Sequence, residues 1–257
     1  MGYNKSIRSG NQFELYEYEK ECVARGRPRG YRYHSEREML HDGGEASFRE
    51  RVFLRRKDNA RRSSMAFRRI ILSNLTTIEN PLLFTITFKE NRQSLSDCAK
   101  YFHLFTINLR NIYGKGFRYI AVPEFQERGA VHYHALFWGI ENKRELLQER
   151  LSGYYQNVSP FLSDLFGQGF VFLKDTDGHA KLSSYLAKYM VKAICDSRLF
   201  STKAYFASRN ILRPVINKGF PSYWVQDEYH VDDISPLFES KYSTSWLGDG
   251  RYRLFML

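Results

Sequence analysis

The sequence predicts an α+β fold in which a central antiparallel sheet carries helices on one face. From Leu82 onward, the predicted elements run strand, helix, strand, strand, helix, strand, helix, an order typical of this class. Two of the strands are separated by a short turn that contains Gly129, so they are expected to form a hairpin. The chain has 257 residues, 43% hydrophobic and 26% charged, which is enough to bury a core and argues against disordered and fibrous classes.

The chain divides into four predicted segments. Residues 1–46 mix glycine, proline and charged residues with few apolar runs, so we expect an irregular arm. A capping box that starts at Ser47 predicts a basic helical extension over 47–80. The main domain is expected over 81–215, and residues 216–257 form a C-terminal extension.

The main domain begins with a strand and a helix. Residues 82–88 are apolar, β-branched or aromatic and predict a buried strand. Ser94 or Ser96 is expected to cap a helix whose apolar residues follow the 3.6-residue period. Residues 117–125 and 130–138 are then the two strands of the hairpin.

The second part of the main domain repeats the alternation of helix and strand. A helix is expected near 143–151 and a short one after Pro160. Residues 169–173 predict another strand. Asp177 is expected to cap the last helix, about 180–194, which has apolar residues along one side.

Several classes of protein do not fit this sequence. We find neither a long apolar run nor a secretory signal, so a soluble, intracellular protein is expected, in the cytoplasm of the host cell if a phage encodes it. Cys22, Cys98 and Cys195 lie far apart without a CxxC pair, which argues against a disulfide framework or a cysteine-rich zinc module.

The positive charge is concentrated in two blocks, residues 48–71 and 181–221, within a formal net charge of +11. Such blocks are typical of proteins that bind the phosphate backbone of nucleic acids, and arginine suits bidentate phosphate contacts. Two solvated helix faces are the alternative interpretation. The candidate DNA-binding residues are Arg55, Arg56, Arg61, Arg62 and Lys192.

A candidate metal site lies on the predicted hairpin. His132 and His134 are two residues apart on one strand, so both side chains emerge on the same face. Antiparallel pairing would bring Glu124 beside them, although Glu127 competes for this role. Two imidazoles and one carboxylate with open positions would suit Mg²⁺ or Mn²⁺. The alternative is a pair of structural histidines and a surface acid.

A candidate nucleophile lies on the last helix. Tyr185 and Tyr189 are four residues apart and share a helical face, with Lys188 and Lys192 beside them. A phenol has an ordinary pKa near 10, so attack on phosphorus would need help from the lysines and a metal-bound phosphate. The alternative is a pair of core or interface aromatics.

These motifs together resemble the HUH endonucleases, and in particular the rolling-circle replication initiators of small phages, single-stranded DNA viruses and plasmids. Residues 84–88 look like the first motif, His132-Tyr133-His134 like the His-hydrophobe-His motif, and Tyr185 to Lys188 like the Tyr-x-x-Lys motif. Tyr189 resembles the second tyrosine of some phage initiators. Glu124 stands where related viral initiators keep an acidic ligand. The resemblance covers about residues 81–195, and it is weaker over 205–210.

The resemblance implies a palm-like sheet and a specific chemistry. Glu124, His132 and His134 would hold the divalent metal, and Tyr185 would attack the scissile phosphate of single-stranded origin DNA. The products would be a 5′-phosphotyrosyl link and a free 3′-hydroxyl that primes synthesis. Tyr189 would release and rejoin the displaced strand, and Lys188 would orient the phosphate.

The resemblance also implies partners, and it leaves alternatives. The sequence has no phosphate-binding Gly-x-x-x-x-Gly-Lys-Ser/Thr motif, so a host helicase is expected to unwind the DNA and a host polymerase to extend it. A transposase or relaxase of the same superfamily is one alternative. A non-enzymatic protein that binds single-stranded nucleic acid through stacked aromatics is the other.

Overall fold

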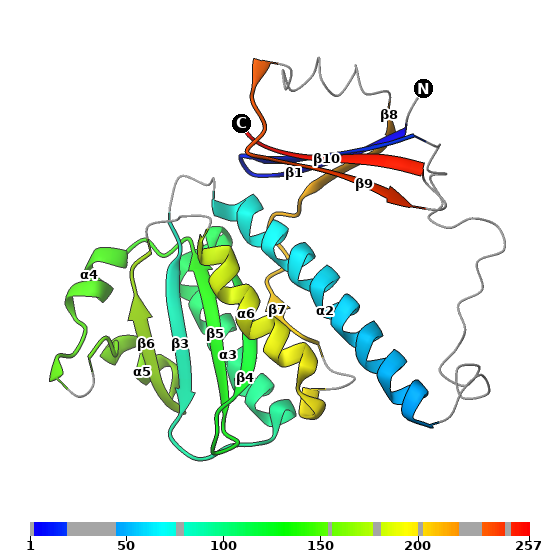
Figure 1. The fold of residues 1–257 in the computed structure, drawn as a ribbon. Coiled ribbons are helices and arrows are strands. Elements are labelled where there is room, and N and C mark those ends of the chain that lie inside the picture. The colour runs from blue at the N-terminus through cyan, green and yellow to red at the C-terminus, as the bar shows by residue number, and fades with distance from the viewer. Residues whose placement is uncertain are drawn as a thin grey trace. The chain divides into compact units, whose positions relative to one another are not determined.

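The computed structural model contains two compact units, one formed by residues 59–212 and the other by 1–58 together with 213–257 (Figure 1). The structure describes residues 3–19, 45–75, 80–153, 156–176, 181–199, 203–220, 233–244 and 248–257. Among the described helices, none is both long and apolar enough to cross a membrane.

The unit of residues 59–212 is built on a five-stranded antiparallel sheet in the order β6-β3-β5-β4-β7. Its strands are β3 (Leu82–Phe88), β4 (Arg118–Phe125), β5 (Val131–Trp138), β6 (Gly169–Lys174) and β7 (Phe206–Ala207). The predicted hairpin is confirmed, since β4 and β5 pair throughout their length. Every side chain of β5 is buried, which places this strand at the centre of the sheet with both faces covered.

One face of this sheet packs against α3 (Leu95–Tyr113), α4 (Lys143–Gln148) and α5 (Pro160–Phe166). The hydroxyl oxygen of Ser94 caps α3 by accepting a hydrogen bond from the backbone N–H of Asp97, so Ser94 and not Ser96 is the cap. Tyr133 of β5 points into this core, where its ring stacks on Phe102 with centroids 4.4 Å apart. The α+β class with a central antiparallel sheet is therefore confirmed.

The opposite face is covered as well, which corrects the expectation that helices occupy one face only. There α6 (Lys181–Cys195) and the C-terminal part of α2 (Glu45–Leu75) bury Leu136 and Trp138 of β5. Figure 1 shows α6 lying along the sheet, over β4 and β5. The sequence does not predict this second layer, because α2 resembles a basic helix exposed to solvent. Two of its apolar residues, Phe67 and Ile71, are nevertheless fully buried.

The second unit is a sheet made from both ends of the chain, in the order β8-β1-β2-β10-β9. Its strands are β1 (Tyr3–Ser9), β2 (Gln12–Tyr18), β8 (Val215–Phe220), β9 (Phe238–Thr244) and β10 (Gly248–Met256). Our prediction of an irregular arm was therefore wrong for residues 3–18. The physical reason for the error is that β2 pairs with β10, which lies far away in the sequence. Local sequence patterns do not predict such a long-range partner.

Segment ends differ from the predicted ones by a few residues. Helix α2 begins at Glu45, before the predicted start at Ser47, and the described part of α2 ends at Leu75. The second half of α2 belongs to the same compact unit as the sheet, whereas we expected the domain to begin at 81. The predicted cap at Asp177 lies outside the described residues. Two short 3₁₀ turns, Gly114–Gly116 and Ser197–Leu199, follow α3 and α6.

We predict that Gly139, which follows β5, is required for stability. Its φ is +72°, and a Cβ there would lie 2.5 Å from the carbonyl oxygen of Gly116. Gly139→Ala is therefore expected to lower the free energy of unfolding by about 2–4 kcal/mol, from backbone strain plus this clash. Gly114→Ala is the matched control, since Gly114 has a φ of +73° and nothing within 4 Å of its added Cβ. Equal losses in urea denaturation of the two variants would contradict the prediction.

Candidate active site

The β4–β5 hairpin brings the candidate metal ligands together. Glu124 on β4 lies directly opposite His132 on β5 in the register of the two strands. Because Tyr133 points into the core beneath α3, the side chains of His132 and His134 emerge on the other face, beneath α6. Both histidines are buried, with 8% and 7% of their surfaces exposed. The register thus favours Glu124 over Glu127 as the partner of the pair.

Glu124 connects the sheet to α6. Its Oε2 lies 2.8 Å from Nε2 of His134, and its Oε1 accepts a hydrogen bond of 2.8 Å from Nζ of Lys192. On the far side of the His134 ring, Nδ1 lies 3.5 Å from Oγ1 of Thr85 on β3. An ionised carboxylate can only accept, so Nε2 of His134 carries the proton in this arrangement and the Thr85 hydroxyl faces the acceptor nitrogen.

The electrostatics of the pocket favour neutral imidazoles beside an ionised carboxylate. Burial, together with the nearby His134 and Arg128, lowers the pKa of His132 to about 4. Burial also lowers the pKa of His134, against the opposing effect of Glu124. Burial raises the pKa of Glu124, but the hydrogen bonds from Lys192 and His134 outweigh it, and the net shift is downward. Neutral imidazole and carboxylate are the forms that bind metal ions.

Helix α6 places both tyrosines at the histidine pair. The ring of Tyr189 stacks on that of His134, with centroids 3.7 Å apart and an angle of 20°. The hydroxyl of Tyr189 donates a hydrogen bond of 3.0 Å to the hydroxyl of Tyr185. Burial and this donated bond raise the pKa of Tyr189 above its usual value. Tyr185 is the more accessible ring, with 37% of its surface exposed.

The two lysines of the helix are placed differently. Lys192 lies on the face of the tyrosines, because it pairs with Glu124 and its Nζ is 5.9 Å from the centroid of the Tyr189 ring. Lys188, the lysine of the Tyr-x-x-Lys motif, is exposed. The cavity over the histidines, about 730 Å³, is lined by Lys192 and Arg128 among others, but not by Lys188. Lys192 is therefore the lysine that faces the site.

The chemistry of the donor set fits a divalent metal ion. Nε2 of His132 is buried without a hydrogen-bond partner, as expected of a nitrogen that serves as a ligand. Within the described part of the chain, no group of three or more His, Cys, Asp and Glu side chains is arranged as a metal site. Both oxygens of Glu124 are engaged, one by His134 and the other by Lys192. A metal ion would replace these two contacts.

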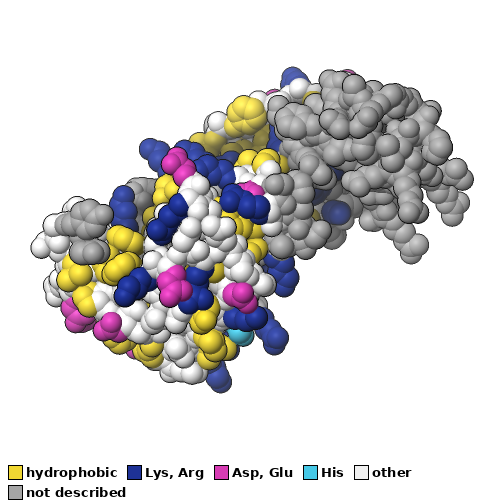
Figure 2. All heavy atoms as spheres, turned by 90° about the horizontal axis from the view of Figure 1, so that it is seen from below, with side chains coloured by type: hydrophobic (Ala, Val, Ile, Leu, Met, Phe, Trp, Pro, Cys, Tyr) yellow, Lys and Arg dark blue, Asp and Glu magenta, His cyan; other side chains and the backbone are white. Residues whose placement is uncertain are grey.

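The candidate DNA-binding arginines lie on α2. Arg61 and Arg62 are exposed, whereas the side chains of Arg55 and Arg56 lie outside the described residues. On the face drawn in Figure 2, Lys and Arg side chains are spread over the surface with Asp and Glu among them. The charge on that face is therefore mixed, and the basic character expected of a DNA contact is not gathered there into a patch.

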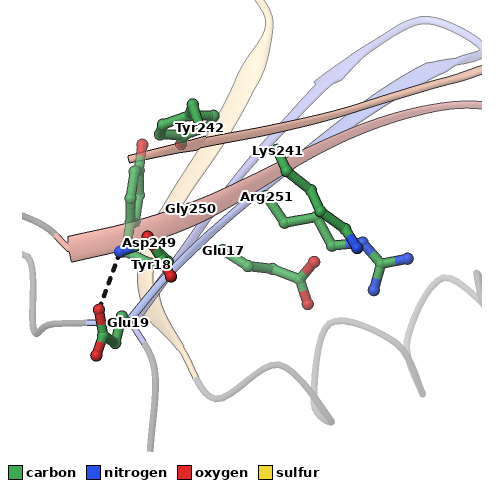
Figure 3. A pocket seen from close by; sticks show the side chains of 8 residues that line it. All are labelled: Glu17, Tyr18, Glu19, Lys241, Tyr242, Asp249, Gly250 and Arg251. Carbon is green, nitrogen blue, oxygen red and sulfur yellow. Dashed lines mark hydrogen bonds between the residues drawn. The ribbon is translucent and has the colours of Figure 1, made fainter. Parts of the chain in front are cut away.

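A second cavity, of about 620 Å³, lies in the unit of residues 1–58 and 213–257 (Figure 3). It is lined from β2, β9 and β10 by both acidic and basic side chains, among them Glu17, Lys241 and Arg251. Glu19 closes one end by accepting a hydrogen bond of 2.9 Å from the backbone N–H of Asp249. The mixed charge of this cavity does not point to a phosphate.

Comparison with protein families bears directly on the unit that contains the site. Residues 81–194 match the family described as Replication-associated protein ORF2/G2P. These residues, called the replication-associated segment below, are less than half of the 257 residues, and they include the hairpin, both histidines and both tyrosines. Searches of curated proteins and of solved structures gave no significant match. The family match relates the segment to DNA replication and hence to contact with DNA.

The replication-associated segment also contains functional candidates that the sequence did not single out. Thr85 lies in the first strand motif, but only the register with His134 shows that it faces the imidazole. Phe125 and Arg128 line the cavity over the histidines. Lys192 was predicted to bind DNA. It follows Tyr185 by seven residues, about two helical turns, so it shares the helical face of Tyr185, and there it pairs with Glu124.

We predict that the ring of Tyr189 is a packing element independent of its hydroxyl. Tyr189→Ala should lower the free energy of unfolding by about 1–3 kcal/mol, because the stack on His134 is lost. Tyr189→Phe keeps the ring and should change stability by less than about 1 kcal/mol. Tyr185→Ala, at the more exposed ring, serves as the control and should cost less than Tyr189→Ala. Thermal unfolding measures all three, and an Ala variant as stable as the Phe variant would contradict this role.

Proposed function

We propose that this protein is a rolling-circle replication initiator that nicks single-stranded origin DNA through attack by Tyr185. The observation that carries the proposal is the meeting of three motifs at one place: Thr85 faces His134, Tyr189 stacks on His134, and the Tyr189 hydroxyl reaches Tyr185. The family of residues 81–194 supports an initiator role in replication. The nicking chemistry and the roles of individual residues are our proposal.

The geometry supports different roles for the two tyrosines. Tyr185 is the better nucleophile because its side chain is the more exposed and its hydroxyl accepts the hydrogen bond from Tyr189. A donated hydrogen bond stabilises negative charge as it develops on the Tyr185 oxygen. Tyr189 has a raised pKa and serves first as this donor. In a later step, Tyr185 is linked to DNA and no longer accepts this hydrogen bond. The Tyr189 hydroxyl would then attack phosphorus in turn.

The proposed step is a transesterification. The oxygen of Tyr185 forms a bond to the scissile phosphorus and gives up its proton to solvent. The bond from phosphorus to the 3′-oxygen of the preceding nucleotide breaks, and that oxygen takes up a proton. The products are a 5′-phosphotyrosyl link and a free 3′-hydroxyl. The number of phosphoester bonds is unchanged, so rejoining by the reverse attack needs no nucleotide cofactor.

His132, His134 and Glu124 would hold the divalent metal ion, Mg²⁺ or Mn²⁺. When bound, the ion supplies charge that polarises the scissile phosphate. With the metal ion at Nε2, the proton of His134 would lie on Nδ1, and Thr85 would orient the ring by accepting a hydrogen bond from Nδ1–H. Lys192, released from Glu124, would be free to approach the phosphate from α6.

The DNA strand would also contact basic residues outside the pocket. Arg61 and Arg62 are exposed on α2 and are proposed to contact phosphates, together with Arg55 and Arg56. A host helicase and polymerase would then unwind the duplex and extend the 3′-hydroxyl. Lys188, exposed on α6, would act on the DNA strand rather than inside the pocket.

We expect the protein to form a covalent adduct with single-stranded DNA that survives denaturant. The probe is a set of 3′-labelled single-stranded fragments that span the replicon encoding this chain, incubated with Mn²⁺. Tyr185→Phe should abolish the adduct because it removes the attacking oxygen. Tyr189→Phe should slow adduct formation about 10- to 100-fold, since one hydrogen bond to a charged oxygen is lost. Binding without any adduct would instead support a non-enzymatic single-stranded DNA binder.

Metal binding should depend on the buried histidines. Titration of Mn²⁺ into the protein, followed by the magnetic resonance signal of free Mn²⁺, is expected to show one site. His132→Ala should weaken this site at least tenfold, because it removes a proposed ligand. His103→Ala, an exposed position on α3, is the control. Adduct formation should stop in excess EDTA and return with added Mn²⁺. Unchanged Mn²⁺ affinity in His132→Ala would contradict the ligand assignment.

A further inference from the structure

A second hollow adjoins the cavity over the histidines. Its volume is about 340 Å³, and it shares Glu124, Phe125 and Lys192 with that cavity. Its remaining wall comes from the end of α6 and the turn that follows, including Leu199 and the exposed Cys195. A strand whose scissile phosphate lies over the histidines would therefore place its neighbouring nucleotide at this hollow.

Arg198 adjoins this hollow through two of the residues that line it, Phe125 and Asp196. Its guanidinium carbon lies 3.9 Å from the centroid of the Phe125 ring. Asp196 holds the guanidinium from the side, since its two carboxylate oxygens accept hydrogen bonds of 2.9 Å from Nε and 2.6 Å from Nη2. The Arg198 side chain remains about half exposed, at 49%. A guanidinium fixed on an aromatic ring and open to solvent is a surface on which a planar group can stack.

The two cationic side chains near the hollow each form an ion pair with a carboxylate that lines it. Lys192 pairs with Glu124, and Arg198 pairs with Asp196, so each cation has its own carboxylate. Phe125 and Leu199 add apolar surface. Lys192 would leave Glu124 for the scissile phosphate when the metal ion binds, but at Arg198 a second phosphate would still have to compete with Asp196, whereas an uncharged aromatic ring would not. The chemistry of the hollow therefore matches a nucleobase rather than a phosphate.

We propose that this hollow is a subsite for the base of the nucleotide next to the scissile phosphate, with Arg198 on Phe125 as its stacking platform. The proposal rests on the proposed function, because that function supplies the DNA strand. It assigns Arg198 and Phe125 as residues that position the strand. Asp196 keeps the guanidinium in its plane.

The test compares two single strands that carry the same phosphates. One is a fluorescein-labelled 20-nucleotide oligothymidylate, and the other is a 20-unit strand of abasic sites. Arg198→Ala should weaken binding of the oligothymidylate roughly 5- to 100-fold, because one base loses its stacking partner. Binding of the abasic strand should change no more than in Arg110→Ala, a matched loss of one exposed arginine on α3, beneath the opposite face of the sheet.

Two further measurements keep the proposal falsifiable if Arg198→Ala disturbs the local fold. Arg198→Lys keeps the charge but not the plane, and it should still lose affinity for the oligothymidylate. In the unaltered protein, alkylation of Cys195, followed by peptide mass spectrometry, should slow in the presence of the oligothymidylate and less with the abasic strand. Equal affinity ratios for the two strands in Arg198→Ala and Arg110→Ala, or no protection of Cys195, would overturn the proposal.

The outcome also separates this proposal from the proposed function. If the covalent adduct forms and Arg198→Ala binds both strands like Arg110→Ala, the subsite is wrong and the nicking activity stands. If Arg198→Ala loses oligothymidylate affinity while no adduct forms under any condition, the hollow binds a base and the nicking chemistry is wrong.

Discussion

The site depends on one carboxylate, that of Glu124, which joins the hairpin to the helix that carries the tyrosines. One of its oxygens meets His134 on the central strand, and the other meets Lys192 on α6. Burial alone would push this group toward its neutral form, and the two contacts reverse that tendency. Glu124 thus adds a polar link between the hairpin and α6, whose position over the sheet is otherwise set by the packing of Leu186 and Met190.

This link matters because the two histidines beside Glu124 are buried. His134 lies between the ring of Tyr189 and the strands, and Nε2 of His132 has no hydrogen-bond partner. A buried polar nitrogen of this kind carries an energetic cost that packing does not recover. Proteins keep such groups where they serve a ligand, and the proposed metal ion would satisfy this nitrogen. The same ion would take the place of Lys192 at the carboxylate.

Local patterns predicted the elements that carry the chemistry. A few adjacent residues are enough to predict the apolar strand β3, the hairpin and the cap of α3 at Ser94 or Ser96. The alternation of a strand was enough to place His132 and His134 on one face. It was not enough to show which lysine of α6 faces them, since that depends on the rotation of the helix against the sheet. The sequence likewise did not predict that helices cover the second face of the sheet, because the apolar residues of α2 are few and lie among arginines.

The sheet built from both chain ends has a consequence for the order of folding. Strand β2 pairs with β1 on one side and with β10 on the other, so its second neighbour is synthesised only after the whole unit of residues 59–212. The unit of residues 59–212 contains all of its own strands and can close before that moment. Long-range pairing of this kind is slow, and an unpaired strand edge is prone to aggregation. During synthesis, the N-terminal hairpin must therefore keep unpaired strand edges while the unit of residues 59–212 is already assembled.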